Sequence, residues 1–90
     1  MRMADIITGR LTKAFNPTFL QVVDESHHHE GHSGSRPGGQ THFRVNIVAA
    51  AFSGKSRLER HRLINAALAA ELAAGVHALA IHAGAPDERR

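Results

Sequence analysis

The feature that most constrains this chain is a histidine- and glycine-rich segment between two stretches typical of β-strands. Residues 27–40, HHHEGHSGSRPGGQ, hold four of the eight glycines and one of the three prolines, which favour turns over regular structure. TFLQVVDES (18–26) precedes the segment, and THFRVNIVA (41–49), whose apolar residues alternate with polar ones, follows it. Such alternation indicates a half-buried strand. We therefore predict an antiparallel hairpin whose loop, residues 27–40, is poorly ordered without a partner.

Helices are predicted on both sides of this hairpin. Apolar residues recur every three or four positions over residues 4–15, and Pro17 ends that helix because the residue before a proline avoids the helical region. Ser56 and Glu59 form a capping box, which predicts a long helical segment reaching about Ala74 and dividing near His61. The predicted apolar stripe of this segment comprises Leu58, His61, Ile64 or Asn65, Leu68 and Leu72.

A last strand completes the predicted fold. Gly75 suits the C-terminal cap of the long helix. VHALAIHA, residues 76–83, is predicted as a strand with His77 on its apolar face, and residues 86–90 as a polar tail. With no repeat or internal boundary, the 90 residues predict a single domain of the α+β class. Its order is α-β-β-α-β, with the helices on one face of a three-stranded sheet.

Composition excludes several classes of protein. The chain has no cysteine, which rules out disulfides and all-cysteine metal sites. Its longest apolar run, residues 47–52, is far shorter than the roughly 20 residues of a membrane span, and the first residues lack the apolar centre of a secretory signal. We expect a soluble, unexported, cytoplasmic protein of bacterial type. Eight histidines make its formal charge of +3 sensitive to pH near their ordinary pKa of about 6.5.

FSGKS, residues 52–56, resembles part of a phosphate-binding loop. That motif needs a glycine at position 49, where this chain has Ala49. A chain of 90 residues also leaves no room for the other parts of a nucleotide-hydrolysing site. Nucleotide hydrolysis is therefore not expected, although Lys55 and the free amides at a helix start can bind a phosphate.

Cationic side chains crowd the start of the long helix. Two interpretations stay open for them: a solvated helix face, which is the commoner fate of a charge run, and a phosphate-contacting surface. Arg44 is expected nearby. The G-x-x-G loop of a nucleic-acid-binding KH domain is absent, because Arg57 stands three residues after Gly54. The crowded residues are Lys55, Arg57, Arg60, His61 and Arg62.

The histidine-rich segment is internal and joins two predicted strands, so it is not a tag. HEGH, residues 29–32, differs from the zinc-protease motif H-E-x-x-H by its spacing and by Gly31. Neutral imidazoles suit zinc, copper, nickel and iron, and both a functional site and adventitious affinity remain open. Elsewhere, His61 is expected in the core and His42 on a more exposed strand position. His77, where a strand begins, admits a structural or a functional role.

Three stretches together resemble the BolA family: LQVVDESHHHEGH, THFRVNIVAAAFSGKSRLERHRLINAALAAEL and GVHALAI. The resemblance runs from about Ile6 to Pro86. Its most specific part is the combination of FSGKS, RHR and VHAL in this order. It implies an α-β-β-α-α-β fold similar to class II KH domains, and a protein that is not an enzyme.

The resemblance also implies a partner and a cofactor. BolA-like proteins pair with monothiol glutaredoxins and share a 2Fe–2S cluster, with a glutaredoxin cysteine and a glutathione thiol on one side. On this chain, His77 is the implied main ligand and His29 the second, with His28, His32 and His27 as alternates. Imidazoles on one iron and thiolates on the other resemble a Rieske centre. The isolated chain, a monomer or weak homodimer, is expected to bind no cluster because it has no cysteine.

A second role follows from the same resemblance. Some bacterial members resemble transcriptional regulators of stress response and cell morphology that bind DNA through a helix-turn-helix-like segment. In this chain the segment would be Ser56–Leu72. We rank the adaptor role first because it uses the most specific histidines. The residues implied at DNA phosphates are Lys55, Arg57, Arg60 and Arg62.

Overall fold

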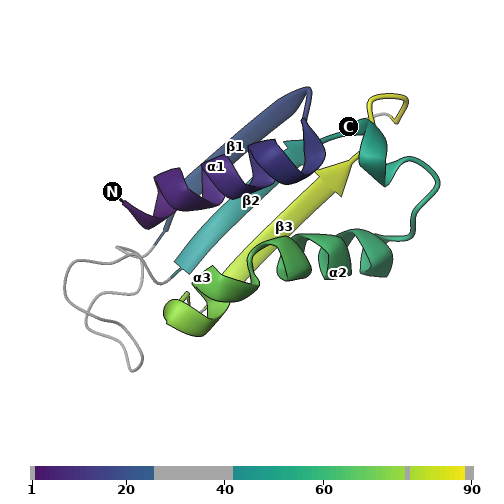
Figure 1. Cartoon of the computed structure of the whole chain (residues 1–90). Helices are drawn as coiled ribbons and strands as arrows, with labels where there is room; N and C mark the ends of the chain where they lie inside the picture. Colours follow the sequence, from purple (N-terminus) through teal and green to yellow (C-terminus); the bar gives the residue numbers. More distant parts are fainter. Residues whose placement is uncertain (1, 26–41, 77, 89–90) are drawn as a thin grey trace.

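The computed structural model describes residues 2–25, 42–76 and 78–88 of the chain (Figure 1). The predicted order of the loop 27–40 and the predicted placement of His77 therefore lie outside the described residues. The elements confirm the predicted α+β class and the α-β-β-α-α-β order. They are α1 (Met3–Phe15), β1 (Phe19–Asp24), β2 (His42–Val48), the short 3-10 helix η2 (Ala50–Phe52), α2 (Arg57–Ala67), α3 (Ala69–Ala74) and β3 (Ala78–Gly84).

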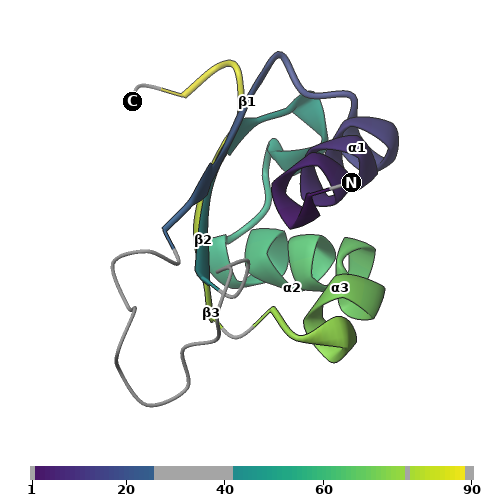
Figure 2. The same ribbon diagram turned by 90° about the vertical axis from the view of Figure 1, so that its left-hand side faces the viewer.

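The strands form one sheet in the order β1-β2-β3. β1 and β2 are antiparallel, with Val22 opposite Val45, as the hairpin prediction requires. β3 lies parallel to β2, with Ile81 beside Val45. A parallel neighbour cannot be reached by a tight turn and needs a crossover, which η2, α2 and α3 supply. The sheet seen edge-on carries α1, α2 and α3 on the same face (Figure 2).

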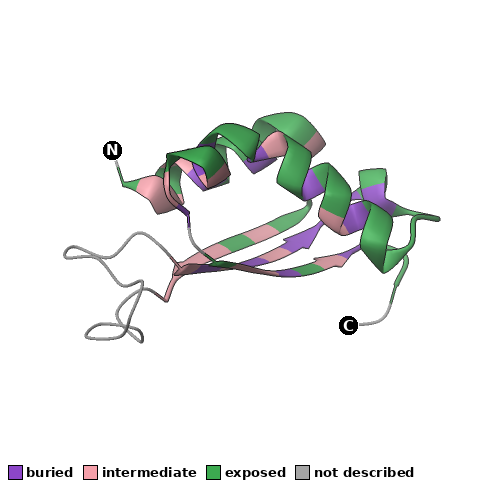
Figure 3. Ribbon diagram, turned by 90° about the horizontal axis from the view of Figure 1, so that it is seen from below, coloured by how far each residue is buried: buried purple, intermediate pink, exposed green. Residues whose placement is uncertain are grey.

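The alternation of β2 decides which face of the sheet carries the core. Phe43, Val45 and Ile47 are at most 2% exposed and belong to one core cluster with residues of the helices, so they lie on the face that the helices cover. Buried positions of the helices and of the sheet face each other between the two layers (Figure 3). The core residues contributed by the helical layer include Ile7, Leu11, Phe52, Ile64 and Leu68.

Both predicted helix ends are formed by local hydrogen bonds. At the end of α1, Asn16 takes the left-handed conformation (φ 46°) that asparagine tolerates, and its amide donates to the Thr12 carbonyl. At the start of α2, the amide of Ser56 donates to the Glu59 carboxylate at 2.7 Å, and the amide of Glu59 donates to the Ser56 hydroxyl at 3.1 Å. The predicted capping box is therefore confirmed.

The helical segment divides at a different residue from the one predicted. The break lies at Leu68 (φ −105°, ψ 17°) and not near His61. The Leu68 side chain is only 1% exposed, so the change of backbone direction leaves it in the core while α3 turns away. Sequence spacing does not reveal this break, because the apolar pattern continues across it.

The buried face of α2 is also rotated from the prediction. Leu58 is 58% exposed, whereas Arg60 is 9% exposed and occupies the inward position one turn before Ile64. The segment predicted as a polar tail explains why Arg60, and not Leu58, is buried. Residues 86–88 turn back onto the fold, where the Glu88 carboxylate accepts hydrogen bonds from Arg60 and from the amide of Ala85. A charged residue with such a partner can occupy a position that hydrophobicity alone assigns to leucine.

The described ranges contain no helix that is both long and apolar enough to cross a membrane.

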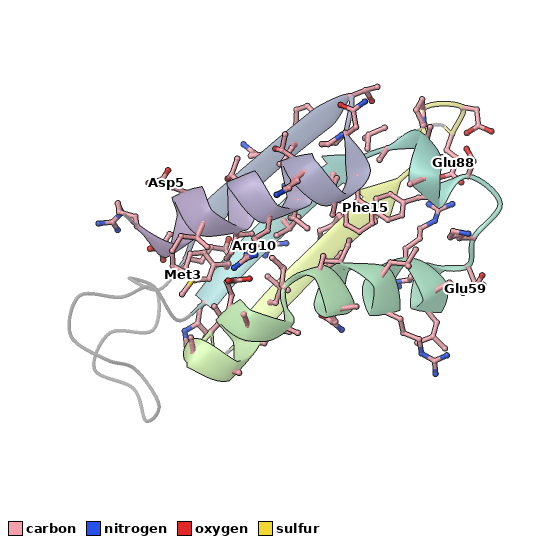
Figure 4. The ribbon with its side chains drawn as sticks, viewed as in Figure 1. Met3, Asp5, Arg10, Phe15, Glu59 and Glu88 are labelled. Carbon is pink, nitrogen blue, oxygen red and sulfur yellow. The ribbon has the colours of Figure 1, made fainter. Side chains whose placement is uncertain are left out.

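We expect Phe52→Ala to lower the free energy of unfolding by about 3–5 kcal/mol, because it empties a fully buried site. Phe52 is 0% exposed, and its ring centre lies 5.0 Å from that of Phe15, which is labelled in Figure 4. The matched control is Phe19→Ala. Phe19 is 50% exposed, and its loss should cost less than about 1 kcal/mol. Urea unfolding followed by circular dichroism measures both, and equal losses would contradict this core.

Candidate functional site

The chain ends that flank the undescribed residues meet at one end of the sheet. The amide of Glu25, just after β1, donates to the carbonyl of His42, where β2 begins, at 2.8 Å. His42 in turn pairs with Ala78, where β3 begins. Residues 26–41 are joined to Glu25 and His42, and residue 77 is joined to Ala78. The topology therefore attaches the histidine-rich segment and His77 to three neighbouring positions.

The predicted cluster ligands themselves lie outside the described residues. They are His77, His29 and the alternates His28, His32 and His27. Within the described ranges, no group of three or more histidine, cysteine or acidic side chains could hold a metal ion. The ligand assignment thus stays a prediction from the resemblance.

Arg60 differs from the other predicted phosphate contacts because its side chain is engaged inside the fold. Its guanidinium donates to the carbonyls of Lys55 and Ala83, each at 3.0 Å, and to both carboxylate oxygens of Glu88. The hydrogen bond to Glu88 raises the pKa of Arg60 above its ordinary value. Arg60 fastens the turn before α2, the end of β3 and residues 86–88 together. The expectation that it faces solvent with its neighbours is wrong.

Lys55, Arg57 and Arg62 are exposed at the start of α2, as predicted. They belong to the capped start and the first two turns of α2, and the label of Glu59 marks this helix start in Figure 4. Free amides and the partial positive charge of a helix start add to their attraction for anions. The electrostatics of this end of the molecule therefore favour anions such as phosphate groups.

Arg44 does not join this cationic surface, contrary to the expectation. It alternates with the buried Phe43 and Val45, so it points to the sheet face that the helices leave open. Its Nε donates to the Glu25 carboxylate at 3.0 Å, and its Nη1 lies 3.2 Å from Nε2 of His82. Because an arginine can only donate, the imidazole nitrogen of His82 accepts in this contact. Arg44 thereby links Glu25, which follows β1, to His82 of β3.

Three further histidines occupy distinct surroundings. His61 is half-buried rather than in the core, and it lines a cleft with His82. His82 is exposed on β3, and His42 is half-buried at the start of β2. Sequence reasoning missed His82 and Glu88. The signal for His82 was its two-residue offset from Ala80 on the open face of a strand, whereas Glu88 gave no local signal.

Comparison with known proteins points to one family. A family model described as BolA-like protein matches residues 11–88. The chain is 50% identical over 80 residues to BolA-like protein 1 of Bos taurus, covering 89% of this chain and 56% of that protein, so it spans little more than half of that relative. It is 45% identical over 82 residues to the DNA-binding transcriptional regulator BolA of Escherichia coli K12, covering 91% of this chain and 74% of that protein.

A solved structure extends the likeness to the fold. The BolA domain of SufE1 from Arabidopsis thaliana matches with a TM-score of 0.86 at 44% identity, covering 96% of this chain and 94% of that chain. The two curated relatives are named as a BolA-like protein and as a regulator rather than as enzymes, which is consistent with the expected absence of catalysis.

We expect acid to weaken the start of α2 through Glu59. The hydrogen bond from the Ser56 amide lowers the pKa of Glu59 below its ordinary 4.5. A carboxyl group whose pKa is lowered in the folded state contributes its full stabilisation above pH 4.5. That contribution is lost as the pH falls through the pKa of the folded state. The stability difference between the original chain and Glu59→Gln should therefore shrink in acid. Urea unfolding from neutral to acidic pH measures it, and a constant difference would contradict this role.

Proposed function

The chain belongs to the BolA family, and on this premise we propose that it is a non-enzymatic adaptor. It binds a monothiol glutaredoxin and shares a 2Fe–2S cluster with it, in iron–sulfur cluster trafficking or in iron and redox sensing. The observation that carries the proposal is the meeting of chain ends at Glu25, His42 and Ala78. It tethers the two separate sources of histidine to the same end of the sheet.

The donor chemistry of the chain fits this cargo. The chain has no cysteine, so the ligands it can offer the irons are imidazole nitrogens. Two imidazoles leave two of the four terminal ligand positions of a 2Fe–2S cluster for thiolates from elsewhere. His77 would be the main ligand and His29 the second, with His28, His32 and His27 as alternates. A cluster with mixed imidazole and thiolate ligands supplies a raised reduction potential.

The two kinds of ligand differ in how the chain supports them. His77 is one residue from Ala78, which is fixed in the parallel ladder with β2, and follows Val76, which is 7% exposed in the core. The loop histidines are spread through a glycine-containing segment in which adjacent imidazoles can replace one another. Loss of His77 should therefore matter more than loss of any single loop histidine.

We expect His77→Ala to abolish the visible circular dichroism of the shared cluster and His29→Ala only to weaken or alter it. The measurement is co-expression or reconstitution with a monothiol glutaredoxin and glutathione, followed by absorption and circular dichroism. His82→Ala is the matched control, because it removes an exposed histidine from β3, the strand that follows His77 in sequence. An unchanged spectrum for His77→Ala would reduce His77 to a structural residue.

DNA binding is the second candidate function, supported by the name of the Escherichia coli relative and by the exposed cations of α2. In this account Ser56–Leu72 contacts DNA mainly through phosphates. Lys55, Arg57 and Arg62 make the contacts, whereas Arg60 holds the surface together from inside.

If DNA binds here, the logarithm of affinity should fall with the logarithm of salt at a slope of about −3, one unit for each cation. Replacing both Arg57 and Arg62 with alanine should reduce the slope to about −1. Lys13→Ala, which removes an exposed cation from α1, is the control and should leave the slope unchanged. Fluorescence anisotropy with a labelled duplex measures it, and an unchanged slope in the double variant would remove α2 from the interface.

A further inference from the structure

A cleft of about 390 Å³ lies along β3 beside the start of α2. Arg57 and His61 come to it from the helical layer, and His82 from the open face of the sheet. Neither the glutaredoxin proposal nor the DNA proposal uses β3 itself. The cleft is lined by Arg57, His61, Ile81, His82, Ala83, Gly84 and Glu88.

Within the ranges that the structure describes, the strand that borders this cleft has no other strand paired with its outer edge. β3 is the outermost strand, with β2 as its neighbour in the described sheet. The carbonyl of Gly84 points toward β2, since it accepts from the amide of Ala49. Peptide groups alternate in direction along a strand, so those of Ala83, Ile81 and Leu79 point outward. Such unpaired edge groups are a template for another strand.

One end of this edge is already closed and the rest is open. Arg60 donates to the outward carbonyl of Ala83 at 3.0 Å, which confirms the direction of that peptide group. Among the described residues, no hydrogen bond to the outward groups of Leu79 and Ile81 is present. The open stretch therefore offers alternating donors and acceptors at the spacing of a peptide backbone.

The charges around the edge select an acidic occupant. Arg57 is exposed, and His61 and His82 stand on opposite faces of the edge. The one carboxylate in the cleft, Glu88, is bound by the Arg60 guanidinium. An added strand would direct alternate side chains toward Arg57 and His61 and toward His82. A carboxylate on the first side would meet the positive charge of Arg57. One on the other side would accept a hydrogen bond from Nδ1 of His82, whose Nε2 accepts from Arg44.

We propose that the outer edge of β3 docks an extended acidic segment of a partner protein, which joins the sheet as a fourth strand. Nucleic acid fits this edge less well, because the outward carbonyls of Leu79 and Ile81 require donors that a phosphate backbone lacks. The proposal goes beyond cluster sharing and does not depend on it.

The test uses the full chain labelled with nitrogen-15 and a capped octapeptide of alternating threonine and glutamate. We expect amide hydrogen exchange at Leu79 and Ile81 to slow on binding, by about tenfold or more at saturation. Arg57→Glu should weaken binding by about tenfold. Arg57 is exposed at the first position of α2, where an acidic residue is compatible with the helix dipole, so the variant should fold.

Arg62→Glu is the matched control, because it makes the same charge change on the same helix but lines a different hollow with Lys55 and Glu59. Its affinity should change by less than about twofold. Absence of protection at Leu79 and Ile81, or equal losses in both variants, would overturn the proposal. So would protection of the same amides by oligothymidylate, or by raised protein concentration without peptide. Reconstitution of the cluster with the Arg57→Glu variant and a glutaredoxin tests the glutaredoxin proposal separately from peptide docking.

Discussion

The parallel pairing of β3 with β2 determines how the helices and the chain ends are arranged around the sheet. It forces the chain to cross one face of the sheet through η2, α2 and α3, and this crossing forms most of the helical layer. It also places the start of β3 beside His42, where the histidine-rich segment rejoins the sheet. With an antiparallel β3, Ala78 would stand at the opposite end of the sheet from His42.

The same topology separates the two surfaces to which the family resemblance assigns functions. α2 begins where β3 ends, because Arg60 joins the turn before α2 to Ala83 and Glu88. The exposed cations therefore lie at the end of the sheet away from Ala78. β3 has seven residues, which at roughly 3.3 Å each span about 20 Å. Cluster sharing and phosphate binding would thus use different ends of the molecule and need not exclude each other.

Local patterns predicted local structure, and contacts between distant residues account for the differences. The alternation in β2 and the capping box at Ser56 each depend on neighbours in sequence, and both predictions are confirmed. Arg60 is buried through Glu88, 28 residues away, and the break at Leu68 follows from its place in the core. Arg44 was predictable, since the alternation that buries its neighbours turns it away from the helices. The assignment of the ligand histidines rests on the family resemblance, because the structure describes only the residues next to them.

Sharing of a cluster with a monothiol glutaredoxin can be measured by native mass spectrometry of the two co-expressed proteins. We expect a one-to-one heterodimer that carries one 2Fe–2S cluster and one glutathione. We also expect His77→Ala to return the cluster to a glutaredoxin homodimer. A heterodimer that keeps its cluster in His77→Ala, or a cluster found only on glutaredoxin homodimers beside the unmodified chain, would contradict the adaptor proposal.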